Sequence, residues 1–179
     1  LVLGTTVSTV STVAAQSESE PSQEAIDRAN GRLQEGIEAF QAGNYRSAWR
    51  DLRRVLREAV DTPGLLSDQR LARGFVVAMQ AQQEDGDYED AVEIGEEYVL
   101  PALRSGGARP QLAPAVVEYA EVLALVGRPD DARPLLEGVL SGQPRNILAA
   151  NALGQLLFLV GERDGAFQFL SRLQDREPQ

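Results

Sequence analysis

A short motif that occurs four times in the sequence limits the possible folds more than any other feature. In each copy a glycine stands five residues before an alanine, between two stretches whose apolar residues have helical spacing; the four glycines are Gly43, Gly86, Gly127 and Gly161. Glycine readily ends a helix because it adopts the left-handed conformation, and alanine lets a second helix approach closely. The motif therefore predicts four helical hairpins. Their second helices are expected to be capped by Asn44, Asp87 and Asp130.

The residues around the third and fourth motifs repeat as well. Gly161 follows Gly127 by 34 residues, and apolar or small residues recur at the same offsets from both glycines. In the third unit they are Val116, Tyr119, Ala120, Leu123, Ala132, Leu136 and Val139, followed by Pro144; in the fourth they are Ala150, Leu153, Gly154, Leu157, Ala166, Leu170 and Leu173, followed by Pro178. This pattern resembles the tetratricopeptide repeat, a helical hairpin with a period of 34 residues.

The first two units are longer, because 43 residues separate Gly43 from Gly86 and 41 separate Gly86 from Gly127. Insertions of 9 and 7 residues explain these spacings, and Pro and Gly residues place them at residues 60–64 and 104–110. The resemblance implies an all-α fold, an α-α superhelix (solenoid) of about four helix-turn-helix units over residues 22–179. We predict eight helices, near residues 22–42, 45–60, 65–84, 88–104, 112–126, 130–141, 145–160 and 163–175.

The composition excludes many kinds of catalytic site. All 17 basic residues are Arg, and the chain of 179 residues has no Lys, His or Cys. Thiolate, imidazole and Schiff-base chemistry and Cys/His zinc sites are therefore excluded, and no cofactor is expected. A net charge of −10 argues against general nucleic-acid binding.

Carboxylates are the remaining catalytic groups, so a carboxylate-dependent hydrolase is a remote alternative to a protein that is not an enzyme. The acidic residues are densest at positions 84–97, which coincide with a repeat turn and the start of a helix. Acidic side chains are favourable at such a position without any metal, so we expect a solvated turn and no metal site there.

The N-terminal segment suggests export. Residues 1–15 carry no charge and end in Val13-Ala14-Ala15, which resembles the end of a secretory signal; a disordered tail is the alternative. Residues 16–21 are a polar linker. We expect a periplasmic or secreted protein of the exported bacterial type, or a cytoplasmic one if residues 1–15 are not a signal remnant. No later stretch approaches the about 20 apolar residues that a membrane span needs, so no span is expected in the mature chain.

A stripe of arginines on the second predicted helix is a possible secondary docking surface. Such a stripe could dock an anionic partner, or it could pair within the molecule with the acidic helix at residues 89–97, its expected neighbour. Two aromatic residues on the final helix are further candidates. Together these residues are Arg46, Arg50, Arg53, Arg54, Arg57, Phe167 and Phe169.

The resemblance also implies a concave groove lined by the first helix of each hairpin. Its inward positions are Asn30, Leu33, Ile37, Phe40, Arg73, Val76, Gln80, Gln83, Val117, Glu121, Leu125, Asn151, Gln155 and Phe158. Leu33 and Ile37 stand where chaperone-binding members of the family need polar groups, which excludes a clamp for a C-terminal carboxylate. The mixed lining suits an extended or helical peptide. Alternatively, Leu33, Ile37 and Val117 pack between neighbouring units.

These observations lead to two main hypotheses of function. The first is a non-catalytic protein-interaction module or scaffold that binds another protein or a peptide in the groove. The second is a structural subunit of a larger envelope assembly, or a homo-oligomer, that docks through its C-terminal end. That end favours docking because apolar residues lie on the final helix where solenoids normally have a polar cap.

Overall fold

The computed structural model describes residues 20–105 and 109–174. The predicted signal remnant at residues 1–15 and most of the linker at 16–21 lie outside the described residues. Within them all regular structure is helical, and no strand is present. The predicted all-α solenoid of four helical hairpins is therefore confirmed.

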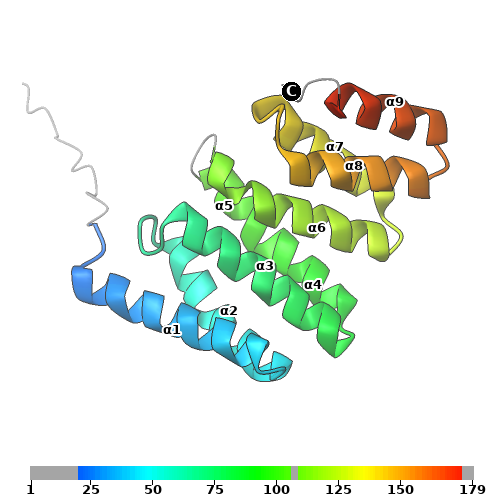
Figure 1. The fold of residues 1–179 in the computed structure, drawn as a ribbon. Coiled ribbons are helices and arrows are strands. Elements are labelled where there is room, and N and C mark those ends of the chain that lie inside the picture. The colour runs from blue at the N-terminus through cyan, green and yellow to red at the C-terminus, as the bar shows by residue number, and fades with distance from the viewer. Residues whose placement is uncertain (1–19, 106–108, 175–179) are drawn as a thin grey trace, which may run out of the picture.

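The helices form four antiparallel pairs along the stack (Figure 1). The first pair is α1 (Gln23–Gln41) and α2 (Tyr45–Asp61). The second is α3 (Asp68–Asp85) and a composite helix of α4 (Tyr88–Ile94), a π-helical turn (Gly95–Val99) and α5 (Leu100–Ser105). A 3₁₀ turn (Pro110–Leu112) leads into the third pair, α6 (Ala113–Leu125) and α7 (Pro129–Gly142). The fourth is α8 (Ile147–Leu159) and α9 (Arg163–Gln174).

The first helices of the pairs stack on one another. Helix α3 contacts α1, α6 contacts α3, and α8 contacts α6, so α1, α3, α6 and α8 form one layer (Figure 1). We call the exposed surface of these four helices the first-helix face. None of the described helices has the length and apolar character that a membrane crossing requires.

The turns between paired helices have the predicted backbone conformation. Gly43, Gly86, Gly127 and Gly161 all have φ between 74° and 89°, in the left-handed region that favours glycine. Asn44 and Asp87 precede the first residues of α2 and α4, although neither side chain caps the helix. The prediction for Asp130 is wrong: Pro129 begins α7, so Asp130 lies in its first turn.

The alanine of each motif is buried, as the close helix crossings require. Ala48, Ala91 and Ala132 are fully inaccessible, and Ala166 is 4% exposed. They lie within or beside a continuous apolar core that runs through all four units and whose largest fully buried side chain is Phe75. Burial of this core along the whole stack is what stabilises a solenoid.

The inserted segments explain where the helices differ from the prediction. Helix α3 begins at Asp68 and not at residue 65, because the Ser67 side chain accepts a hydrogen bond from the backbone N–H of Arg70, and Leu65 and Leu66 are buried in the connection. The predicted helix at 88–104 contains the π-helical turn that starts at Gly95.

Arg109 ties the second inserted segment to the stack. Its guanidinium donates hydrogen bonds to the Asp68 carboxylate, one of them from Nε at 3.0 Å, and Nη1 donates to the carbonyl oxygen of Ala102 at 3.0 Å. The side chains of Arg109 and Asp68 are 16% and 32% exposed. The connection between the second and third units is therefore fastened to the start of α3.

Candidate functional site

Three of the residues predicted to line the groove are buried. Leu33, Ile37 and Val117 are 4%, 3% and 5% exposed and belong to the apolar core. They present almost no surface to a ligand, and their burial corresponds to the alternative in which they pack between neighbouring units.

The other eleven predicted residues reach the surface to different degrees. Asn30, Phe40, Val76, Gln80 and Gln83 are half-buried. The Phe40 ring lies 5.6 Å from the Tyr45 ring between centroids, so it also joins α1 to α2. The exposed ones are Arg73, Glu121, Leu125, Asn151, Gln155 and Phe158.

The clearest polar arrangement on the first-helix face joins α3 to α6. Gln80 Nε2 donates to Glu118 Oε2 at 3.0 Å, and Gln83 Nε2 donates to Glu118 Oε1 at 2.8 Å. Although Glu121, one turn further along α6, is accessible to solvent, partial desolvation by the surrounding protein raises its pKa, and the charge of Glu118 raises it further. We call Gln80, Gln83, Glu118 and Glu121 the amide–carboxylate cluster.

Sequence reasoning identified three members of this cluster and missed Glu118. The signal available was its position three residues before Glu121, which places both carboxylates on neighbouring turns of one helix face. The two glutamine amides fix the Glu118 carboxylate, and no arginine in the described ranges pairs with either glutamate. The cluster is therefore a pre-oriented, uncompensated negative centre.

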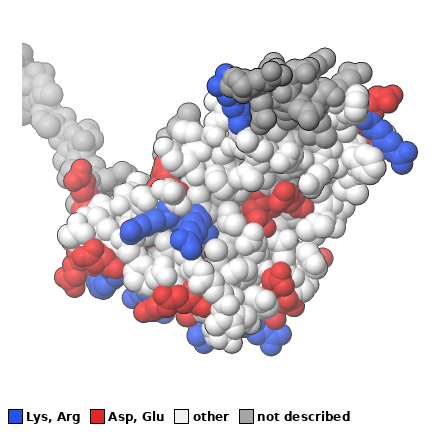
Figure 2. Space-filling view, viewed as in Figure 1, with Lys and Arg blue, Asp and Glu red and all other residues white. Residues whose placement is uncertain are grey.

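Opposite charge lies elsewhere on the same face. Arg73 is exposed and stands seven residues before Gln80, on the same side of α3, and it makes no ion pair within the part of the chain that the structure describes. Figure 2 shows an acidic group over α6 and a basic group near α3 and α1, with further acidic groups along the outer edge of the molecule. A basic group and an acidic group thus lie side by side in the middle of the first-helix face.

The arginine stripe on α2 is largely engaged within the molecule. Arg46 Nε lies 2.8 Å from Asp85 Oδ2, Arg57 donates to the Tyr98 hydroxyl at 3.4 Å, and the Arg53 guanidinium lies 5.8 Å from the Trp49 ring centroid. The expected ion pairs with acidic residues 89–97 are not seen among the described side chains, so that part of the prediction is wrong. The partners are instead Asp85 at the end of α3 and the aromatic residues Tyr98 and Trp49, because α2 meets the second unit through the contact of these two rings.

The remaining stripe residues, Arg50 and Arg54, are exposed. Arg50 is 3.2 Å from the neighbouring Asp51. Within residues 20–105 and 109–174, no group of three or more acidic side chains is placed to hold a metal ion.

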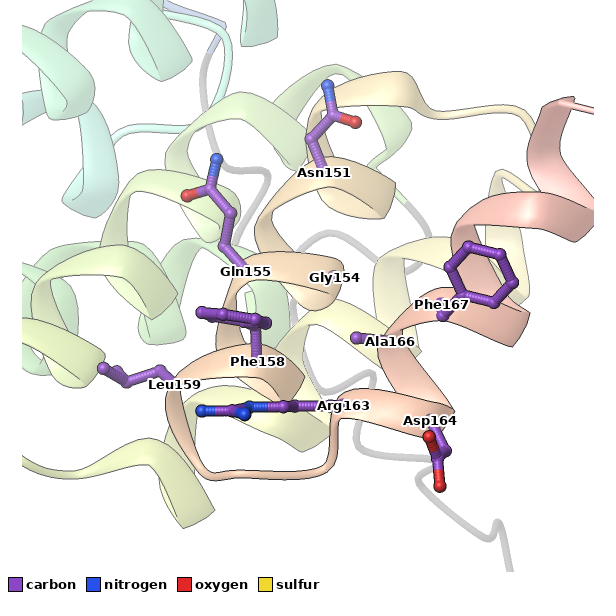
Figure 3. Close-up of a pocket in the computed structure, with 9 residues that line it drawn as sticks. All are labelled: Asn151, Gly154, Gln155, Phe158, Leu159, Arg163, Asp164, Ala166 and Phe167. Atoms are coloured by element: carbon purple, nitrogen blue, oxygen red, sulfur yellow. The ribbon is translucent and has the colours of Figure 1, made fainter.

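A second candidate surface lies at the C-terminal end of the stack (Figure 3). It is an open pocket of about 760 Å³ between α8 and α9, lined by Asn151, Gly154, Gln155, Phe158, Leu159, Arg163, Asp164, Ala166 and Phe167. Phe158 and Phe167 are 62% and 75% exposed, and the Arg163 guanidinium lies 5.5 Å from the Phe158 ring centroid. Phe169, in contrast, is half-buried and packs against the core.

Comparisons with known proteins agree with the architecture. Residues 123–179 match the family model of the tetratricopeptide repeat. The solved structure of YrrB, described as a TPR protein with an unusual peptide-binding site, superposes with a TM-score of 0.56 at 19% identity, over 87% of this chain and 74% of YrrB. MamA of strain AMB-1 superposes with a TM-score of 0.52 at 22% identity, over 84% of this chain and 75% of MamA. No curated protein matches the sequence significantly.

Proposed function

We propose that this chain, as a tetratricopeptide repeat protein, is a non-catalytic module that binds a segment of another polypeptide along its first-helix face. The family assignment rests on the match of residues 123–179 to the family model and on the fold of the whole described stack. A scaffold for protein interactions is the general role that this fold suggests. The finer proposal is where the segment lies and which chemistry it presents.

The observation that carries the proposal is the amide–carboxylate cluster. Each glutamine donates its amide to Glu118 and keeps a carbonyl oxygen, so the cluster presents acceptors: two carboxylates and two carbonyls. Acceptors that are already oriented favour a partner group that is rich in donors. We propose that an Arg or Lys side chain of the bound segment occupies this place, since charge-assisted hydrogen bonds are about twice as strong as neutral ones.

Arg73 provides a second charged site, which would fix the orientation of the bound segment along α3. Seven residues of helix separate Arg73 from Gln80, which is a distance of about 10 Å along α3. A carboxylate of the partner placed about 10 Å from its cationic group meets both sites. This spacing corresponds to about three residues of extended chain or about seven of a helix.

A peptide library displayed on phage, selected against the protein, tests the proposal. Enriched sequences should contain Arg or Lys with Asp or Glu at such a spacing. In fluorescence anisotropy with an enriched peptide, Glu118→Gln should weaken binding about tenfold or more, because the charge is lost and the side-chain volume is kept. Binding should also weaken as the pH is lowered, because the raised pKa of Glu121 brings its protonation to a higher pH.

Arg54→Gln is the matched control, since Arg54 is exposed on α2, outside the first-helix face. It should leave binding unchanged. Enrichment of acidic or wholly apolar peptides, or loss of binding in Arg54→Gln with retention in Glu118→Gln, would show that recognition runs through another surface.

A further inference from the structure

The end of the stack presents a face that the preceding units bury. Helix α3 packs on α1 and α2, α6 packs on α3 and α4, and α8 packs on α6 and α7. The equivalent face of the fourth unit, formed by α8 and α9, holds the open pocket of about 760 Å³ and is not covered by any described helix (Figure 3).

Residues 34 positions apart show how this face differs from its counterpart in the third unit. Its floor keeps the small residues of the stack, because Gly154 and Ala166 correspond to the buried Ala120 and Ala132. Gly154 and Ala166 are themselves buried, and their small size lets α8 and α9 cross closely, as Ala120 and Ala132 do for α6 and α7. The face is thus built like the one on which α8 itself packs.

The surrounding positions have become aromatic. Arg133 of the third unit reaches the fourth, where its Nη1 donates to Glu162 at 2.9 Å. The corresponding residue of the fourth unit is Phe167, which is 75% exposed, and Phe158 stands where the third unit has Ala124. Exposed aromatic side chains grouped around a pocket mark an interaction site whose partner is apolar.

The charges select a second copy of the chain as the occupant. The whole chain has a net charge of −10, but residues 138–179 contain four Arg and four acidic residues, so their side chains carry no net charge. Two copies that meet at this end therefore avoid the mutual repulsion that every more acidic part of the surface would cause. The opposite end does not match the apolar anchors of the face, since α1 exposes Glu24, Asp27, Glu35 and Glu38, whose charges would have to be desolvated against Phe158 and Phe167.

The rim of the pocket carries both charges that a self-complementary two-fold contact can pair. Arg163 and Asp164 are neighbours of opposite charge at its edge. In a two-fold contact the same patch meets itself, so Arg163 of each copy can lie opposite Asp164 of the other.

We propose that the protein forms a two-fold dimer in which the α8–α9 face of one copy packs on the same face of the other, with Phe158 and Phe167 as the apolar anchors. The contact leaves the amide–carboxylate cluster on α3 and α6 open. The dimer therefore displays two binding faces at once, and a partner with two recognised segments binds with avidity. The dimer itself does not depend on the proposed peptide binding.

Light scattering on the full chain tests the proposal, at concentrations up to about 100 μM, which exceed the Kd of a micromolar dimer. We expect twice the chain mass of 19.4 kDa. Phe158→Asp with Phe167→Asp should weaken the dimer at least about tenfold, with an unchanged helical circular dichroism spectrum because both side chains are exposed. Leu125→Asp is the matched control: Leu125 is 65% exposed at the corresponding position to Leu159, one unit earlier, and its change should leave the dimer intact.

A charge exchange tests the symmetry. Arg163→Asp alone should weaken the dimer, and its combination with Asp164→Arg should restore it, because the exchange regenerates the same pairs across the two-fold axis. A monomer at every concentration, growth beyond a dimer into open chains, or a dimer that survives the double Phe change would each overturn the proposal.

Discussion

Gly95 lies directly against the ring of Tyr119, so closely that a Cβ atom at residue 95 would overlap Cδ2 of the tyrosine. Gly95 opens the π-helical turn of the second unit, and Tyr119 belongs to α6 of the third. The tyrosine is 3% exposed, and its pKa is raised mainly by that burial. The absence of a side chain at one position thus lets an aromatic ring fill the boundary between two units.

This contact predicts a large effect of the smallest possible substitution. Gly95→Ala should lower the free energy of unfolding by about 1 to 3 kcal/mol, because the buried ring must move to admit a methyl group. Chemical denaturation followed by circular dichroism measures the change. Gly138→Ala in α7 is the control: nothing lies within 4 Å of a Cβ there, and the change should stabilise the helix by about 0.5 to 1 kcal/mol. Equal effects of the two substitutions would refute the contact.

The Asp68–Arg109 pair predicts a pH-dependent contribution to stability. The hydrogen bond from Arg109 is the largest cause that lowers the pKa of Asp68. Because the folded-state pKa lies below the unfolded value of about 3.9, the contribution is present above that pH and is lost as the pH falls through the folded-state value. Asp68→Asn should therefore lower the Tm at neutral pH, and its difference from the unmodified protein should shrink in acid.

Two further variants check the origin of this effect. Arg109→Gln should give the same pH-dependent difference in Tm, and the double variant should lose little more than either single one. Asp61→Asn, at an exposed carboxylate at the end of α2, should change little at any pH. A difference between Asp68→Asn and the unmodified protein that does not vary with pH would contradict the pairing.

The N-terminal sequence predicts processing. Cleavage after Ala15 follows from the uncharged segment that ends in Val13-Ala14-Ala15. Intact-mass spectrometry of the protein made in its native host should find a chain that begins at Gln16 or within a few residues of it, in the periplasmic or extracellular fraction. An unprocessed N-terminus in the cytosolic fraction would exclude the proposed export.

The repeat architecture was predictable because its determinants are local. Each hairpin depends on a glycine with positive φ and an alanine five residues later, as at Gly86 and Ala91. Because these two residues are close in the sequence, each recurrence of the pair predicts a hairpin. The cap expected at Asp130 failed for an equally local reason, since Pro129 occupies the first helical position more readily.

The parts of the site that depend on stacking were not predictable. Glu118 meets Gln80 and Gln83 across 38 and 35 residues of sequence, and these contacts depend on the rotation of α6 relative to α3. The same rotation decides that Val117 faces the neighbouring unit and is buried. Helical periodicity predicts which residues of a helix face a neighbour only to within about one residue. It therefore cannot distinguish adjacent positions such as the buried Val117 and the cluster residue Glu118.

Three of the interactions described above cross the same boundary, which lies between the second and third units. Arg109 joins the connection to the start of α3, the glutamine amides hold Glu118 near its end, and Tyr119 fills the space against Gly95. The spacing of α3 and α6 is thereby fixed before any partner arrives. A segment that binds across the middle of the stack therefore has little conformational entropy of the receptor to overcome.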